Sequence, residues 1–251
     1  MSVTYKTSEE IEKLREGGRI LAEILKQLAE IAVPGATAMD LENLANKLLE
    51  EKGAKASFLN YNSYPASTCI SINDGLVHGL PQSKLEPFKE GDIVSIDFGV
   101  LYKGLITDSA ITVGVGKIDE ESKKLLSVTK EATMKGIKAA KVGNHVGDIG
   151  FAIETEAKKH GYGIAEGLAG HGVGYEVHED PYIPNYGRKR EGLELKEGMV
   201  IAIEPMFCLG SGKIKVEKDG FSISTKDGKR SAHFEHTVAI TERGPVVLTK
   251  M

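Results

Sequence analysis

One phrase occurs twice in this chain of 251 residues. KEGDIVSID spans residues 89–97, and KEGMVIAIE spans residues 196–204, which is 107 positions later. Both phrases begin with Lys-Glu-Gly, continue as an apolar run and end in a carboxylic acid. A short apolar run after a turn-forming glycine predicts a buried strand. We therefore expect two equivalent strands, each with an acid at the end of its apolar run.

The helices that precede these strands repeat as well. A capping-box pattern at Thr7 and Glu10 opens the first predicted helix, and glycines end the second and the fourth. Corresponding helix positions are 108 residues apart, which matches the strand spacing within one residue. The expected helices span residues 8–32, 37–53, 119–140 and 148–161.

Two similar α+β halves explain why helix, turn, helix and strand all keep the same register. No stretch rich in proline or serine separates the halves. We therefore expect one domain over residues 1–251, with halves at about 7–117 and about 118–249. The halves should share a central antiparallel sheet with the helices on one face. A sequence pattern that is common at the start of strands could explain one match between the halves, but it does not explain why helix, turn, helix and strand all match in the same order.

Composition argues against several classes of function. The net charge is −4, whereas nucleic-acid binders are usually basic, so no nucleic-acid partner is expected. The most apolar region, residues 19–35, is interrupted by charged residues, and the first residues lack a signal segment. No membrane association is therefore expected. The chain has two cysteines, too few for a disulfide framework, which indicates the reducing cytoplasm.

Each half also supplies two acids from neighbouring strands. Asp97 and Asp108 lie on the two arms of a predicted hairpin, and Glu204 and Glu235 occupy the equivalent arms in the later half. A lone acid is more often a surface charge, but the apolar runs before Asp97 and Glu204 favour burial. A two-fold relation between the halves would bring all four acids together at the centre.

Four buried carboxylates would repel one another strongly unless cations neutralised them. Divalent metal ions remove that objection, and four acids suit two ions. His171 lies between two glycines, which let the backbone approach closely, so it is the natural nitrogen ligand. A site of carboxylates with one imidazole favours Mn²⁺, Fe²⁺ or Co²⁺ and is compatible with Zn²⁺.

The segments around these five residues resemble the type I bacterial methionine aminopeptidases. The matching phrases are CISINDGLVHGLP, GHGVGYEVHEDP, IAIEPM and FEHTVAIT, and the resemblance extends from about Thr7 to the end of the chain. It implies the pita-bread fold and a hydrolase that removes the initiator methionine when the second residue is small. It also implies a cytoplasmic monomer that acts on nascent polypeptide N-termini near the ribosome.

The resemblance implies a role for each metal ligand. Asp108 and Glu235 would bridge two divalent ions. Asp97 would chelate one of these ions, and His171 and Glu204 would complete the other.

Three residues are implied in catalysis. Glu204 would also take the proton from the attacking water. His78 would contact the substrate near the scissile amide, and His178 would hydrogen-bond the carbonyl oxygen. Taken alone, each histidine would more often be a structural donor, but the surrounding motifs favour the catalytic roles.

The methionine side chain of the substrate requires an apolar, polarisable pocket. This chain departs from the resembled enzymes at three positions there. Phe221 stands where they often carry Trp, Phe58 where they carry a small residue or Cys, and Val177 where they carry Phe. A preference for methionine is expected to survive these changes. The implied pocket residues are Phe58, Tyr61, Tyr64, Cys69, Val177 and Phe221.

The resemblance also implies a monovalent cation, held by backbone oxygens of Asn73, Gly75 and Ser231. His233 replaces a glutamine that is usual in the resembled enzymes, and it is expected to lie just behind the metal ligands. His236 follows a ligand on an alternating strand and should point away from the site. The other histidines, expected at the surface, are His145 and His160.

Three alternatives remain open from the sequence. A proline-specific hydrolase of the same fold usually carries an additional N-terminal domain, whereas here the pattern starts almost at once. A binding protein that has lost catalysis should lack ligands, and all five are present. The type II enzymes carry a helical insertion between the histidine ligand and the third acid, but here only 33 residues separate His171 from Glu204.

Overall fold

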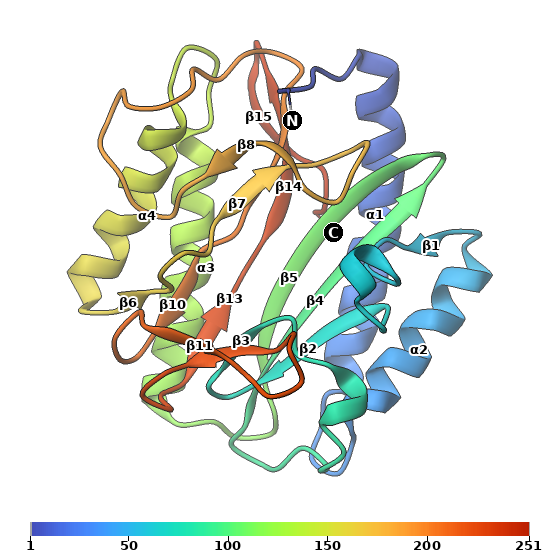
Figure 1. Cartoon of the computed structure of the whole chain (residues 1–251). Helices are drawn as coiled ribbons and strands as arrows, with labels where there is room; N and C mark the ends of the chain where they lie inside the picture. The colour runs from blue at the N-terminus through green and yellow to red at the C-terminus, as the bar shows by residue number, and fades with distance from the viewer. Residues whose placement is uncertain (1, 251) are drawn as a thin grey trace.

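The computed structural model describes residues 2–250 and places two helix pairs on either side of a central group of strands (Figure 1). The predicted helices are confirmed. Thr7 and Glu10 form the expected capping box, and Gly161 ends the last helix with a φ of 71°. The helices are α1 (Ser8–Ile31), α2 (Ala38–Glu51), α3 (Glu120–Ala139) and α4 (Val146–His160).

Each half builds one main antiparallel sheet. In the first half, β4 pairs with β5 along its whole length, and β2 and β1 pair one after the other with its opposite edge. In the second half, the strand order is β15-β14-β9-β7-β8. The first sheet consists of β1 (Lys55–Ala56), β2 (Thr68–Ile72), β4 (Ile93–Tyr102) and β5 (Leu105–Gly114). The second consists of β7 (Gly170–Gly172), β8 (Glu179–Ile183), β9 (Val200–Ile203), β14 (His236–Thr241) and β15 (Gly244–Val247).

The remaining strands form two smaller sheets, with the strand orders β13-β10-β6 and β11-β12-β3. Two short 3₁₀ helices, Tyr61–Ser63 and Pro81–Ser83, lie in the first half. The strands of the smaller sheets are β3 (Gly75–Val77), β6 (Gly163–Ile164), β10 (Met206–Cys208), β11 (Ile214–Val216), β12 (Ile223–Thr225) and β13 (Ser231–His233).

The strands differ from the sequence expectation at two acids, Asp97 and Glu235, and agree with it at Glu204. Asp97 lies in the middle of β4 and does not end it. Glu204 does follow the last residue of β9, because Pro205 has no N–H to continue the ladder. Glu235 was expected on the returning strand, but it lies between β13 and β14. The second-half hairpin is therefore broken on both arms where its acids lie.

Strand alternation explains which residues face the helices. Along β4, Val94, Ile96 and Phe98 are buried against α1 and α2, so Asp97 points to the opposite face. Along β9, Ile201 and Ile203 are buried in the core that contains α3 and α4. The same alternation turns the acids of both halves away from the helices.

The two sheets meet along a seam, which consists of residues 108–112 of β5 and residues 233–237. Threonine hydroxyls replace much of the usual backbone ladder there. The Thr237 Oγ1 atom accepts a hydrogen bond from Asp108 N at 2.9 Å and donates one to Asp108 O at 2.7 Å. The two main sheets are thus joined at the seam by threonine side chains and by a backbone hydrogen bond from Glu235 N to Ala110 O at 2.9 Å.

The α+β class is confirmed, and each helix pair packs on the apolar face of the main sheet of its own half, opposite the face that carries the acids (Figure 1). The division of a single domain at residue 117 stays a prediction. Within residues 2–250, no helix is both long and apolar enough to cross a bilayer.

Candidate metal centre and active site

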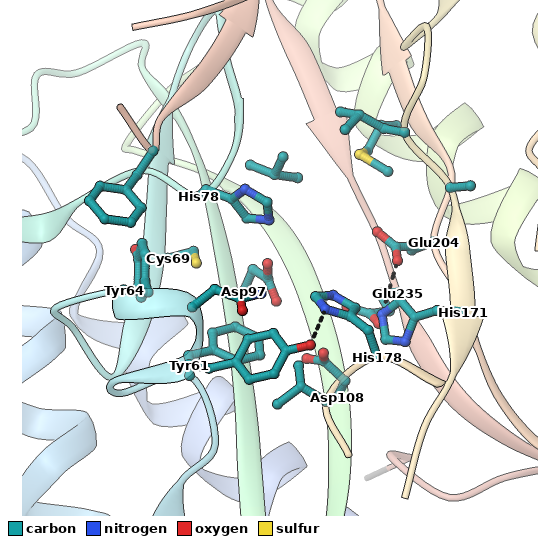
Figure 2. A pocket seen from close by; sticks show the side chains of 18 of the residues that line it. Tyr61, Tyr64, Cys69, His78, Asp97, Asp108, His171, His178, Glu204 and Glu235 are labelled. Atoms are coloured by element: carbon teal, nitrogen blue, oxygen red, sulfur yellow. Dashed lines mark hydrogen bonds and ion pairs between the residues drawn. The ribbon is translucent and has the colours of Figure 1, made fainter. Parts of the chain in front are cut away.

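A cavity of about 290 Å³ opens where the two halves meet, and Figure 2 shows side chains from both halves around it. Asp97 and Asp108 reach it from the first half, whereas His171, Glu204 and Glu235 reach it from the second. All five sequence-predicted ligands therefore lie together. The cavity also receives the two motif histidines, His78 and His178.

The four carboxyl groups are buried, and several of their atoms lack a partner. Suitable atoms of Asp108, His171 and Glu235 lie within 4.8 Å of one another. Oδ1 of Asp97, Oδ1 of Asp108 and Oε1 of Glu235 are buried without a hydrogen-bond partner among the described residues. Buried acceptors without partners are costly, so this cluster requires either protons or a cation.

Burial raises the pKa of each of these carboxyl groups. The pKa of Asp108 is raised to about 8 by burial and then by the nearby Glu204, and burial raises the pKa of Glu204 to about 8. Burial and neighbouring carboxylates also raise the pKa values of Asp97 and Glu235 well above the ordinary range. Without a cation, the cluster therefore retains protons near neutral pH.

His171 is held in the tautomer that a metal ligand needs. Its Nδ1 atom lies 2.9 Å from the carbonyl oxygen of Gly172, which can only accept, so Nδ1 carries the proton. Nε2 then presents its lone pair and lies 3.4 Å from Oε1 of Glu204. Burial lowers the pKa of His171 to about 3, which keeps the ring neutral. The donor set of oxygens and one imidazole nitrogen fits a divalent first-row metal.

Hydrogen bonds to the backbone fix the residues that carry the carboxylates. Asn185 Nδ2 donates to the carbonyl oxygen of Glu204 at 3.0 Å. Ser109 Oγ donates to the carbonyl oxygen of Glu235 at 2.7 Å, across the seam. These contacts leave the carboxylate oxygens free to face the cavity, and they reduce the freedom that metal binding would otherwise have to remove.

The two motif histidines lie on opposite sides of the cavity (Figure 2). His178 Nδ1 lies 3.1 Å from Tyr61 Oη, and its ring contacts the edge of the His171 ring at a centroid distance of 4.3 Å. His78 has a φ of 55°, an unusual value for a residue with a side chain. Burial lowers the pKa of both, that of His78 to about 4, so both rings are neutral at pH 7.

The expected methionine pocket forms one wall of the same cavity. Tyr64 and Phe221 meet edge to face at 5.6 Å, and Tyr64 Oη lies 3.0 Å from the carbonyl oxygens of Thr68 and Gly79. These contacts fix the position of the Tyr64 ring in the wall. Burial raises the pKa of the Cys69 thiol, so it contributes a neutral, polarisable surface. All six predicted residues line the cavity: Phe58, Tyr61, Tyr64, Cys69, Val177 and Phe221.

Sequence reasoning missed several residues that line the cavity. Met206 lies two positions after Glu204, and strand alternation could have placed it on the same face. Leu168 precedes His171 in the glycine-rich segment, but no periodicity identified it. Asn62 lies between the predicted pocket residues Tyr61 and Tyr64, and Tyr182 directly follows the GHGVGYEVHEDP motif, but neither residue was singled out. The missed residues are Asn62, Val77, Gly167, Leu168, Ala169, Tyr182 and Met206.

The remaining histidines match their expected places. His233 is buried, and its Nε2 lies 3.3 Å from Oε2 of Glu204, directly behind the ligand cluster. His236 points away from the cavity and contacts Thr249 Oγ1 at 2.9 Å. His145 and His160 are partly exposed at the two ends of α4.

The residues of the implied monovalent-cation site are also brought together. Ser231 N donates to the carbonyl oxygen of Asn73 at 2.9 Å, and Ser231 Oγ donates to the carbonyl oxygen of Gly75 at 2.9 Å. Asn73 has a positive φ of 55°. Cation binding by these oxygens stays a prediction.

Comparison with known proteins agrees with this geometry. The sequence profile of metallopeptidase family M24 matches residues 12–242. A methionine aminopeptidase of Aquifex aeolicus is 48% identical over the full length of both chains. The crystal structure of a methionine aminopeptidase from Thermotoga maritima superposes on this chain over the full length of both, with 44% identity and a TM-score of 0.97. A prolidase from Pyrococcus horikoshii is more distant, at 26% identity and a TM-score of 0.79, and the match covers 98% of this chain and 63% of the prolidase.

Without metal, the folded chain is expected to lose stability as the pH rises from about 6.5 to about 8. The site carboxyl groups have folded-state pKa values above their unfolded values of about 4, so over this range the folded state still holds protons that the unfolded state has already released, and rising pH favours unfolding. The buried histidines have lowered pKa values and change charge in the unfolded state only below about pH 6.5, so they do not offset this loss. Calorimetry of the metal-free protein should show a melting temperature that decreases as the pH is raised over this range.

Two variants sharpen this measurement. Glu235→Gln removes one titrating group and should make the decrease shallower. Glu30→Ala removes an exposed acid from α1 and should leave the slope unchanged. A melting temperature of the unsubstituted protein that stays constant or rises over this range would contradict the raised carboxyl pKa values.

Proposed function

The chain belongs to metallopeptidase family M24, and from this membership and the cavity we propose that it is a metal-dependent aminopeptidase that removes an N-terminal methionine when the second residue is small. One observation carries the proposal. Five buried side chains with ligand chemistry surround a cavity whose opposite wall is aromatic and apolar. Such a cavity can hold a peptide amine at the acids and an unbranched thioether at the wall.

The five buried side chains would hold two divalent metal ions, and we assign their roles from the resemblance described above. Asp108 and Glu235, which lie on the two sides of the seam, would serve both ions. Asp97 would bind one of these ions, and His171 and Glu204 would bind the other. Such ions supply an activated water and polarise the substrate carbonyl. Mn²⁺, Fe²⁺ and Co²⁺ suit this donor set, and Zn²⁺ is compatible with it.

Three side chains would move or hold protons during hydrolysis. Glu204 would accept a proton from the attacking water and pass it to the leaving amine. If Tyr61 Oη donates to His178 Nδ1, then Nε2–H of His178 is free to donate to the developing oxyanion. His78, on the other side, would contact the substrate near the scissile amide.

The cavity also supports the choice of substrate. The wall that contains Tyr64, Cys69 and Phe221 matches a long, polarisable side chain. His78 and the acids crowd the space beyond the scissile bond, which favours a small second residue. We propose nascent polypeptide N-termini in the cytoplasm as the natural partners and a monomer as the active form.

The role of His178 is tested by His178→Ala. The variant should lower kcat by about 10²–10³-fold, the usual loss for one oxyanion donor, with a much smaller change in KM. Steady-state kinetics on Met-Ala-Ser with metal-reconstituted enzyme gives both constants. His160→Ala, at the far end of α4, is the matched control and should retain full activity. A variant that loses substrate affinity alone would show that His178 only binds substrate.

The proposed specificity is tested with a panel of Met-X-Ser peptides analysed by mass spectrometry. Cleavage should be efficient when X is Gly, Ala or Ser, and poor when X is Leu, Phe, Lys or Glu, because crowding prevents the productive geometry. Equal rates for Met-Ala-Ser and Met-Lys-Ser would refute the narrow site. Faster cleavage of X-Pro peptides than of Met-Ala-Ser would favour a prolidase-like activity instead.

A further inference from the structure

A buried lysine lies near the N-terminus, outside the catalytic cavity. Lys6 is 4% exposed, and its Nζ atom lies 2.6 Å from Oε2 of Glu179. Both side chains of this pair are almost completely buried. Burying two charges is costly unless each is well paired, so the contacts of each group decide what the pair contributes.

Glu179 accepts hydrogen bonds from a loop as well as from the lysine. Its Oε1 atom accepts hydrogen bonds from the backbone N–H groups of Tyr175 at 2.5 Å and Glu176 at 3.1 Å. Its Oε2 atom accepts from Lys6 and from the hydroxyl of Thr4. One oxygen therefore fixes the loop between β7 and β8, and the other fixes the N-terminal segment.

The loop that Glu179 fixes, residues 173–178, carries two residues of the cavity. Val177 is buried in the apolar wall, and His178 extends into the cavity. The ring of His178 is in contact with Tyr61, which itself belongs to a short 3₁₀ segment rather than to a strand. The position of the imidazole therefore depends on the shape of the loop backbone.

Further contacts attach the N-terminal segment to this loop and to the turn before β9. The backbone N–H of Lys6 donates to the carbonyl oxygen of Gly198 at 2.7 Å. The ammonium group of Lys6 lies 4.9 Å from the centre of the Tyr175 ring, and Tyr175 Oη donates to Glu10 at 2.7 Å. The N-terminal segment and the first turn of α1 thus hold the loop from outside (Figure 1).

We propose that Lys6 and Glu179 are positioning residues for His178, acting through the shape of the 173–178 loop. Neither residue lines the cavity, so they act without touching the substrate. The inference rests on the proposed function, because it assigns His178 a task in peptide hydrolysis. It adds that the N-terminal segment, 173 positions away from Glu179 in the chain, completes the active site.

The test uses Lys6→Met, which keeps the unbranched apolar part of the side chain and removes the charged amine. Lys123→Met is the matched control, because Lys123 pairs with Glu120 at 2.6 Å on the exposed first turn of α3. The first readout is hydrogen exchange of the amides of Tyr175 and Glu176, measured by mass spectrometry on the metal-loaded protein. Exchange should accelerate at these amides in Lys6→Met and should not change in Lys123→Met.

The second readout is kinetic. Lys6→Met should lower kcat on Met-Ala-Ser by about tenfold or more, with a smaller change in KM, because a misplaced donor weakens the transition state more than the bound substrate. Metal content and metal affinity should equal those of the unsubstituted enzyme. If Lys6→Met does not fold, Thr4→Ala can be used instead. It removes one donor to Glu179 and should cause the same changes in exchange and kcat, but smaller ones.

The outcomes separate this inference from the proposed function. Unchanged exchange at Tyr175 and Glu176 would overturn the inference, whatever the activity. Faster exchange with an unchanged kcat would also overturn it, since the loop would then not position a group used in catalysis. Loss of metal from Lys6→Met would show a general structural role and would overturn it as well. An unsubstituted enzyme that does not cleave Met-Ala-Ser would contradict the proposed function, while the exchange result would still report on the loop.

Discussion

Mutual repulsion among four buried carboxyl groups is the constraint on which the rest of this structure depends. Asp97 and Asp108 come from one half of the chain, Glu204 and Glu235 from the other, and burial raises the pKa of all four. Three of their oxygens are buried without a partner among residues 2–250. Such a cluster is compatible with a stable fold only if protons or cations neutralise it.

The seam shows how the chain brings these acids together. Thr237 and Thr112 each accept from and donate to the backbone of the opposite half, so the halves are joined beside the acids by short, rigid contacts. The apolar face of each main sheet packs on its own helix pair. The opposite faces are left to form the cavity, and each half contributes a different part of it. The first half supplies most of the aromatic wall, and the second supplies the histidine ligand and His178.

Much of this arrangement was predictable from the sequence, because it follows from periodicity. The 107-residue repeat gave the helix pairs and the paired hairpins, and alternation along β4 and β9 explains why acids flanked by apolar residues face away from the helices. The end of β9 at Glu204 follows from Pro205 in the sequence, but the break at Glu235 was not predictable, because it arises where the two halves must fit each other. The Lys6–Glu179 pair could not be predicted, since no local pattern links residues so far apart in the chain.

The most direct test of the account is calorimetric titration of Asp108→Ala with Mn²⁺ or Co²⁺, compared with the unsubstituted protein and with Glu30→Ala. If Asp108 serves two metal ions at the seam, the variant should bind both ions more weakly and lose activity while remaining folded. Glu30→Ala, which removes an exposed acid from α1, should bind metal as the unsubstituted protein does. An unchanged two-site binding curve for Asp108→Ala would contradict the shared metal centre.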